Sequence, residues 1–218
     1  MPKDLPNAEP DQAPVMRKRP SAWAMIIRGI SHIVHRVFRA LRWLWYNLTC
    51  FIFYRPLPLN TVIHGKLRIL HRPCRLKIGS GGRLGDDVYL ATSMTSSIEI
   101  GRNVAIHAGC ILVAMEGIKI GNGCAIAEYV SIRDQSHNIA AGESVRGQGF
   151  TSAPIEIGEN VWIGRGVYIG AGAKIGDNCV IGANSVVHGE FPPNSLIVGA
   201  PAYVKKSLHD AAPAEEHV

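Results

Sequence analysis

Residues 153–187 decide the fold, and they read APIEIGENVWIGRGVYIGAGAKIGDNCVIGANSVV. From Ile157 onward an aliphatic residue recurs every six positions and is followed by glycine five times in succession. A second small or β-branched residue stands four positions after each aliphatic, and this set is Val161, Val167, Ala173, Cys179 and Ser185. Exact recurrence at six with small residues at the turns predicts a triangular coil that has one short strand on each side.

The same six-residue register appears in three shorter runs upstream. They are Ile78, Leu84 and Leu90; Ile100, Ile106 and Leu112; and Ile120, Ile126 and Ile132. Three six-residue units make one coil, so the four runs together predict an all-β solenoid, a parallel β-helix of about five coils over 60–200. Short interruptions follow Leu90 and Leu112, and a long loop is expected at 138–154. Such excursions leave the coil at a corner and commonly form the binding face.

From Cys124 to Val204 the chain resembles the hexapeptide-repeat acyltransferases, in particular the branch that acetylates hydroxyls of sugars and polysaccharides and includes maltose and galactoside acetyltransferases. The motifs that carry the resemblance are CAIAEYVSIRDQSH at 124–137, the stretch quoted above, and PPNSLIVGAPAYV at 192–204. The resemblance implies a left-handed β-helix, a homotrimer with active sites between subunits, and acetyl-CoA as the donor, with no metal required. The left hand rests on the resemblance, because the general crossover rule would favour the right hand.

The resemblance assigns the role of general base to His137, which stands just before the long loop. A sugar hydroxyl is a weak nucleophile at neutral pH, and a neutral imidazole that takes its proton contributes roughly 10² to 10⁴ in rate. Asp134 fits the family's Asp-x-x-His pattern, as a residue that binds the acceptor or orients the imidazole. An Asx turn explains Asp134 equally well.

Further positions match the family's donor-binding contacts: Trp162, Gly164, Ala171, Ala183 and the basic pair Lys205 and Lys206. An exposed aromatic at a subunit interface is an equal alternative for Trp162. Two departures stand out. His188-Gly189 replaces a Thr-Lys pair whose lysine could meet the CoA phosphates, and His107-Ala108-Gly109 replaces an Asn-containing acceptor segment. We therefore take His107 as a candidate acceptor-binding residue and expect an acceptor other than maltose or galactosides.

The N-terminal third carries most of the net charge of +6, with no acidic residue between Asp11 and Asp86. Within 23–55, apolar residues recur at steps of three and four and define one face of a helix: Ile26, Ile30, Ile33, Val37, Leu41, Leu44 and Leu48. The uncharged stretch 43–54 is twelve residues long, short of the ~20 needed to span a bilayer. A basic amphipathic helix with aromatic residues at its end favours a peripheral contact with an anionic membrane. Packing on the β-helix or on trimer partners is the alternative.

Five cysteines without CxxC spacing predict neither a disulfide framework nor a zinc site. Cys110, Cys124 and Cys179 fall at the fifth position of their repeats, where small side chains point into the coil, so we expect them in the core. We expect 1–22 to be a disordered tail and 201–218 a C-terminal tail.

These observations predict an O-acetyltransferase that acts on a bacterial envelope saccharide, either lipopolysaccharide, exopolysaccharide or a lipid-linked glycan. We expect it to be cytoplasmic and peripheral on the inner face of the inner membrane. An N-acyltransferase for an amino sugar and a non-catalytic β-helix assembly protein are the alternatives. A γ-type carbonic anhydrase is disfavoured because its closely spaced zinc-binding histidines are missing. Nucleic-acid binding is disfavoured by the continuous apolar stripe among the basic residues.

Overall fold

The computed structural model describes residues 22–53, 57–70, 75–142, 144 and 146–209. The chain divides into two compact units, Met1–Phe38 and Arg39–Val218. Helix α1 (Ala22–Phe53) begins in the first unit and ends in the second. In the first unit Ile30, Ile33 and Val37 are all more than half exposed, as expected for the apolar face of an amphipathic helix that this unit does not cover.

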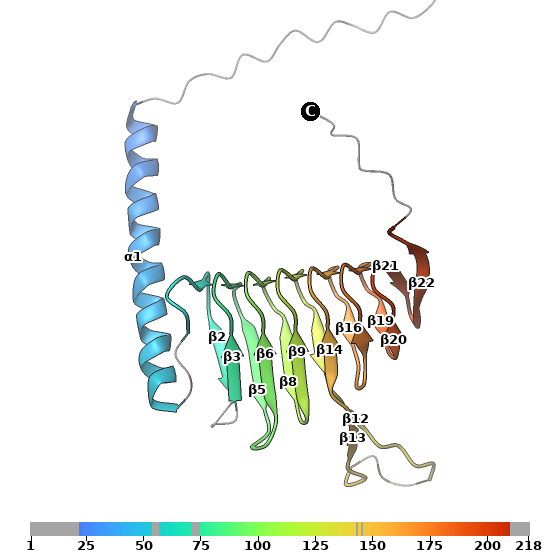
Figure 1. Cartoon of the computed structure of the whole chain (residues 1–218). Helices are drawn as coiled ribbons and strands as arrows, with labels where there is room; N and C mark the ends of the chain where they lie inside the picture. Colours follow the sequence, from blue (N-terminus) through green and yellow to red (C-terminus); the bar gives the residue numbers. More distant parts are fainter. Residues whose placement is uncertain (1–21, 54–56, 71–74, 143, 145, 210–218) are drawn as a thin grey trace, which may run out of the picture. The chain divides into compact units, whose positions relative to one another are not determined.

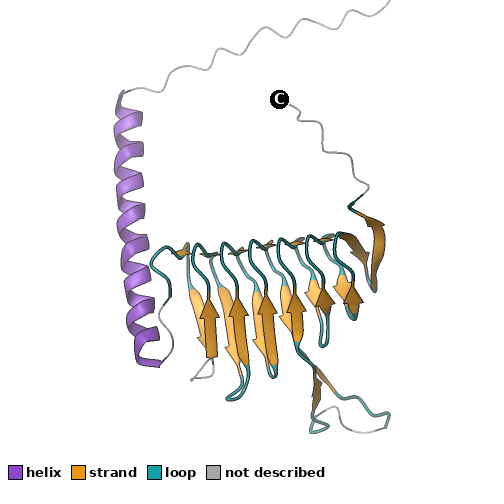
Figure 2. Ribbon diagram, in the orientation of Figure 1, coloured by secondary structure: helices purple, strands orange, loops and turns teal. Residues whose placement is uncertain are grey.

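Three parallel sheets form the sides of a β-helix in the second unit (Figures 1 and 2). Sheet A contains β1 (Val62–Ile63), β4 (Arg83–Leu84), β7 (Ala105–Ile106), β10 (Ala125–Ile126), β15 (Trp162–Ile163), β18 (Val180–Ile181) and β21 (Ser195–Gly199). Sheet B contains β2 (Leu67–Leu70), β5 (Val88–Thr92), β8 (Ile111–Ala114), β11 (Ser131–Arg133), β16 (Tyr168–Ile169) and β19 (Val186–Val187). Sheet C contains β3 (Arg75–Ile78), β6 (Ser97–Ile100), β9 (Gly117–Ile120), β14 (Ile155–Ile157), β17 (Lys174–Ile175) and β20 (Glu190–Phe191).

The chain visits sheets A, B and C in that order six times, so the β-helix has six turns. We call the junction after each sheet A strand the AB corner, and name the BC and CA corners likewise. The predicted parallel β-helix is confirmed, with one turn more than the repeat count suggested. The additional strands are β1 and β2, which precede the first residue of the six-residue register, Ile78 on β3, and β20, which follows the last repeat.

Aliphatic residues stack in register along the inside of the β-helix. Ile126 pairs with Ile106 on one side and with Ile163 on the other, and all three are buried. The fifth positions of the repeats point inward as well, since Cys110, Cys124 and Cys179 are buried free thiols. Burial raises the pKa of Cys110 to about 11. The expectation that these cysteines belong to the core is confirmed.

The second half of α1 packs against the first turn of the β-helix. The Tyr46 hydroxyl accepts a hydrogen bond from the Leu67 N–H at 2.8 Å and donates one to the Leu67 carbonyl at 3.1 Å. Trp43 Nε1 donates to the Pro58 carbonyl at 3.1 Å, and the Arg42 guanidinium donates to the His64 carbonyl. Strand β2 is the edge strand of sheet B, so its outer backbone groups have no neighbouring strand to pair with. The Tyr46 hydroxyl makes hydrogen bonds with two of these groups.

An antiparallel strand covers the edge of sheet A at the other end of the β-helix. Strand β22 (Ala202–Ser207) pairs with β21, the last parallel strand of sheet A. The structure therefore differs from the expected tail at 201–218, because the exposed edge of β21 is a ready partner for a following strand. Residues 1–21 of the expected N-terminal tail and residues 210–218 lie outside the described residues, and Ala22 begins α1. In the part of the chain that the structure describes, no helix combines the length and apolar character that a bilayer crossing needs.

Candidate active site

His137 lies on a hairpin that leaves the β-helix at the BC corner of the fourth turn. Strands β12 (Gln135–His137) and β13 (Phe150–Ser152) pair antiparallel and project from the solenoid (Figure 1). The predicted loop at 138–154 is therefore partly strand. The strands β12 and β13 contain no aliphatic residue that could enter the core, so they do not contribute a side to the coil. His137 is exposed, and no described side chain lies within hydrogen-bonding distance of its imidazole.

Asn138 orders the hairpin immediately beyond His137. Its amide nitrogen Nδ2 donates to the Gln148 carbonyl at 3.1 Å, and its Oδ1 accepts a bond of 2.7 Å from the Thr151 hydroxyl. Its backbone N–H donates to Gly149 at 3.2 Å. The hairpin therefore holds the backbone of His137 in place while its imidazole faces outward.

Asp134 is fully buried at the start of the hairpin. Its Oδ1 accepts a hydrogen bond of 2.7 Å from the Met115 N–H, and its Oδ2 accepts bonds of 2.8 Å from the N–H groups of Glu116 and Gly117. The carboxylate thus faces the backbone of the turn between β8 and β9.

A polar cluster occupies the AB corner of turns three to five. His107 Nδ1 lies 3.3 Å from Glu128 Oε1, and the Arg165 guanidinium lies 5.4 Å from the centroid of the Tyr129 ring. Tyr129 has a φ of 59°, a backbone conformation that bulky residues rarely adopt. His107 follows a sheet A strand whereas His137 follows a sheet B strand, so one chain places these two predicted site residues at different corners.

The predicted donor-binding residues divide between the same corners. Trp162 is 58% exposed on the outer face of sheet A. Gly164 and Ala183 adjoin at the AB corner, where a Cβ on Gly164 would lie 2.7 Å from the Ala183 nitrogen. Ala171 lies at the BC corner beside the returning end of the hairpin, since Gly172 N–H donates to the Ala153 carbonyl at 3.1 Å. Lys205 and Lys206 are exposed on β22.

A hollow on the outer face of sheet B is a surface that the sequence did not indicate. It measures about 430 Å³, and its lining includes Arg68, Tyr89, Ile111, Tyr129 and Arg133. The sequence feature that could have indicated this hollow is the presence of aromatic or aliphatic residues, such as Tyr89 and Ile111, at positions that point outward. A strand whose outer face is solvated would carry polar side chains there. This face therefore offers apolar contact area and guanidinium groups together.

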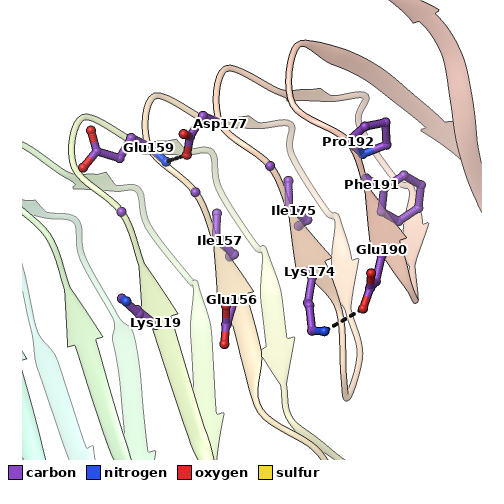
Figure 3. Close-up of a pocket in the computed structure, with 13 residues that line it drawn as sticks. Lys119, Glu156, Ile157, Glu159, Lys174, Ile175, Asp177, Glu190, Phe191 and Pro192 are labelled. Atoms are coloured by element: carbon purple, nitrogen blue, oxygen red, sulfur yellow. Dashed lines mark hydrogen bonds and ion pairs between the residues drawn. The ribbon is translucent and has the colours of Figure 1, made fainter.

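The outer face of sheet C carries a groove of about 740 Å³ (Figure 3). A ladder of alternating charges crosses this face in register: Lys77, Glu99, Lys119, Glu156, Lys174 and Glu190. Lys174 Nζ lies 2.6 Å from Glu190 Oε1, and this hydrogen bond raises the pKa of Lys174. Because each charge has an opposite neighbour, the ladder offers no surplus positive charge to CoA phosphates. Among the described residues, no three His, Cys, Asp or Glu side chains gather as a metal site would require.

The fold and its repeat define a hexapeptide-repeat β-helix protein. Residues 154–189 match the family model described as bacterial transferase hexapeptide (six repeats). This segment of the chain therefore carries the hexapeptide repeat of that family. Galactoside O-acetyltransferase of Escherichia coli (strain K12) is 36% identical over 133 residues, which are 61% of this chain and 64% of that protein. The chain thus spans just under two thirds of the length of this curated relative.

Two solved structures share the fold. Galactoside acetyltransferase in complex with coenzyme A superposes with a TM-score of 0.55 at 33% identity, over 62% of this chain and 66% of that one. The second is a mutant of the N-acyltransferase AntD from Bacillus cereus, in complex with dTDP-4-amino-4,6-dideoxyglucose and coenzyme A. It superposes with a TM-score of 0.57 at 25% identity, over 68% of this chain and 81% of that one.

Proposed function

We propose that the chain transfers an acetyl group from acetyl-CoA to a hydroxyl of a bacterial envelope saccharide, such as lipopolysaccharide, exopolysaccharide or a lipid-linked glycan. The observation that carries the proposal is the exposed imidazole of His137 on a hairpin that leaves the β-helix. The similarity to galactoside O-acetyltransferase supports a hydroxyl acceptor and an acetyl donor.

His137 acts as the general base in a direct transfer. Its neutral imidazole takes the hydroxyl proton while the oxygen attacks the thioester carbonyl, which forms a tetrahedral intermediate. The intermediate collapses by breaking the C–S bond, and the imidazolium returns its proton to the CoA sulfur. The ester forms without a covalent enzyme intermediate, so the buried thiols of the core have no part in the reaction.

Trp162 and the AB corner hold the donor. Trp162 presents an exposed ring to the pantetheine arm, and the small residues Gly164 and Ala183 let that arm approach the backbone. Lys205 and Lys206 on β22 supply the positive charge for the phosphates that the charge ladder of sheet C does not offer.

A second copy of the chain completes the site. His107 and the donor residues Trp162, Gly164 and Ala183 belong to sheet A and the AB corner, whereas His137 projects from the BC corner. A homotrimer would bring the hairpin of one copy to the AB corner of the next. His137→Gln and Trp162→Ala subunits can be dissociated, mixed and reassembled. Activity should return in sites where one subunit contributes an intact Trp162 and its neighbour contributes an intact His137.

Helix α1 attaches the enzyme to an anionic membrane surface. Leu41, Leu44 and Leu48 are more than half exposed, and helical spacing places them opposite Trp43 and Tyr46, which contact the β-helix. The apolar stripe can therefore enter a membrane interface while the β-helix remains outside it.

The membrane contact is tested by vesicle flotation. The full chain should float with vesicles of phosphatidylglycerol and phosphatidylethanolamine and float poorly with phosphatidylcholine alone. Leu41→Gln combined with Leu44→Gln should abolish flotation, and substitutions are preferable to deleting the helix because deletion also removes Tyr46. Equal flotation of the double variant would refute the contact.

Acetyl transfer is tested by incubating the full chain with acetyl-CoA and extracted envelope saccharides, then measuring thiol release and the acetyl increment on the glycan by mass spectrometry. His137→Gln should lose at least about 100-fold in rate while its thermal unfolding is unchanged. His209→Gln, an exposed histidine beyond β22, is the matched control and should retain full activity. Transfer by His137→Gln at the wild-type rate would refute the assignment.

An N-acyltransferase is the second candidate, favoured by the fold that the chain shares with the N-acyltransferase AntD in complex with dTDP-4-amino-4,6-dideoxyglucose and coenzyme A. The same imidazole can take a proton from an amine. Supplying nucleotide-linked amino sugars alongside the hydroxyl acceptors separates the two, because the amide product survives mild alkali whereas the ester is cleaved.

A further inference from the structure

Both ends of the hairpin that carries His137 attach to one turn of the preceding coil. This turn, 115–117, joins β8 to β9 and includes the first residue of β9. Asp134 precedes β12 and accepts all three backbone N–H groups of this turn. Ser152 ends β13, and its hydroxyl donates to Glu116 Oε1 at 2.7 Å. The backbone also joins the two ends of the hairpin directly, since Ala153 N–H donates to the Asp134 carbonyl at 2.9 Å.

The turn requires a carboxylate at position 134. Asp134 is fully buried, and burying a carboxylate is costly unless hydrogen bonds replace its hydration. Three charge-assisted bonds of 2.7 to 2.8 Å supply that replacement. Asparagine has one acceptor oxygen, and its amide nitrogen would point N–H groups at the N–H groups of the turn. The residue type is therefore fixed by the turn alone.

Direct contact between Asp134 and the imidazole of His137 is disfavoured by their spacing. A strand rises about 3.3 Å per residue, so three residues separate the two backbones by roughly 10 Å. The carboxylate oxygens moreover face the turn. Asp134 can influence His137 only through the strand that joins them.

We propose that Asp134, Ser152 and the turn 115–117 form a bracket that positions the catalytic hairpin. Asp134 is thus a positioning residue, which neither binds acceptor nor orients the imidazole by contact. The bracket fixes the exit angle of β12 and hence the place of His137 relative to the bound donor. This inference rests on the proposed role of His137 as the base.

Asp134→Asn is the principal test, with Asp177→Asn as its matched control. Asp177 Oδ1 also accepts a backbone bond from an adjacent coil, at 2.7 Å from Glu159 N–H, but it lies at a CA corner whereas the hairpin leaves from a BC corner. Asn122 Oδ1 accepts the equivalent bond from Arg102 N–H at 2.8 Å. An asparagine can therefore make this contact, and Asp177→Asn should leave kcat unchanged. We expect Asp134→Asn to lower kcat roughly ten- to hundredfold. The KM for acetyl-CoA should stay within about twofold, and the shape of the kcat–pH profile should not change.

Hydrogen exchange measured by mass spectrometry tests the bracket without relying on activity. Asp134→Asn should accelerate exchange in 135–152 and leave the other coils as in the wild type. Ser152→Ala, which keeps all three carboxylate bonds, should give a smaller effect of the same pattern and keeps the test available if Asp134→Asn does not fold.

Wild-type kcat in Asp134→Asn, an altered pH profile, or exchange that rises evenly over all coils would overturn the bracket. If the wild-type chain transfers no acyl group, the proposed function fails, and the exchange pattern still decides whether the bracket exists. If His137→Gln is inactive while both bracket variants are fully active, the function stands and the bracket falls.

Discussion

Replacing Tyr46 with phenylalanine removes one oxygen atom from the contact between α1 and the first turn of the β-helix. That oxygen accepts the Leu67 N–H at 2.8 Å and donates to the Leu67 carbonyl at 3.1 Å. Leu67 is only 5% exposed, so water cannot readily replace either bond. The substitution therefore strands one donor and one acceptor on the edge strand β2.

Each lost bond contributes about 0.5–1.5 kcal/mol, and each buried group left without a partner costs about 1–3 kcal/mol. We therefore expect Tyr46→Phe to lower the free energy of unfolding by about 2–3 kcal/mol. For a chain of this size the corresponding fall in Tm is roughly 5–10 °C.

Thermal unfolding followed by circular dichroism measures the loss, and hydrogen exchange at the Leu67 amide locates it. Tyr203→Phe makes the same chemical change on β22, where the side chain is 59% exposed, and should cost less than about 0.5 kcal/mol. Equal Tm values for the two variants, with unchanged exchange at Leu67, would refute the claim that α1 seals the β-helix.

Three other predictions follow from burial and charge. Because burial raises the pKa of Cys110 from an ordinary 9.0 to about 11, the stabilisation from its neutral thiol is complete below pH 9 and is lost as the pH rises towards 11. In Cys110→Ala, the free energy of unfolding measured by denaturant titration should fall less steeply over this pH range. Lys119→Glu places three like charges in a row with Glu99 and Glu156 and should cost about 1 kcal/mol. The loss should shrink at high salt, and Lys119→Gln is the control. Trp162→Ala should raise the KM for acetyl-CoA roughly tenfold, about 1.4 kcal/mol, with little change in Tm because the ring is mostly exposed; an unchanged KM would exclude it from the donor site.

The six-residue register predicted the core because each buried aliphatic stacks on residues at the same place in adjacent turns. Ile126, Ile163 and Ile181 follow this rule and pair in register. The first two strands were missed because Ile63 and Ile69, which pair with Leu84 and Leu90, stand six residues apart but are followed by the next equivalent residue, Ile78, only after nine. Strand β22 was not predicted because it does not follow the six-residue pattern. It pairs antiparallel with the edge strand β21, and this pairing determines its position.

The candidate site was only partly predictable for the same reason. The position of His137 before a long interruption was visible in the sequence, and the structure places it on the projecting hairpin. The bonds of Asp134 to 115–117 were not visible, because they depend on how one coil lies over the next. The hollow on sheet B likewise arises from side chains of several turns, which only the stacking brings together.

The covered sheet edges at the two ends of the β-helix have a consequence for assembly. A parallel solenoid whose last coil is bare could accept the first coil of another molecule, and repeated addition would build a filament. Strand β22 runs antiparallel to β21 and occupies the edge of sheet A at one end, and Tyr46 of α1 occupies backbone groups at the edge of sheet B at the other. Loss of either cover would expose one more strand edge to pairing and should therefore favour the formation of fibres.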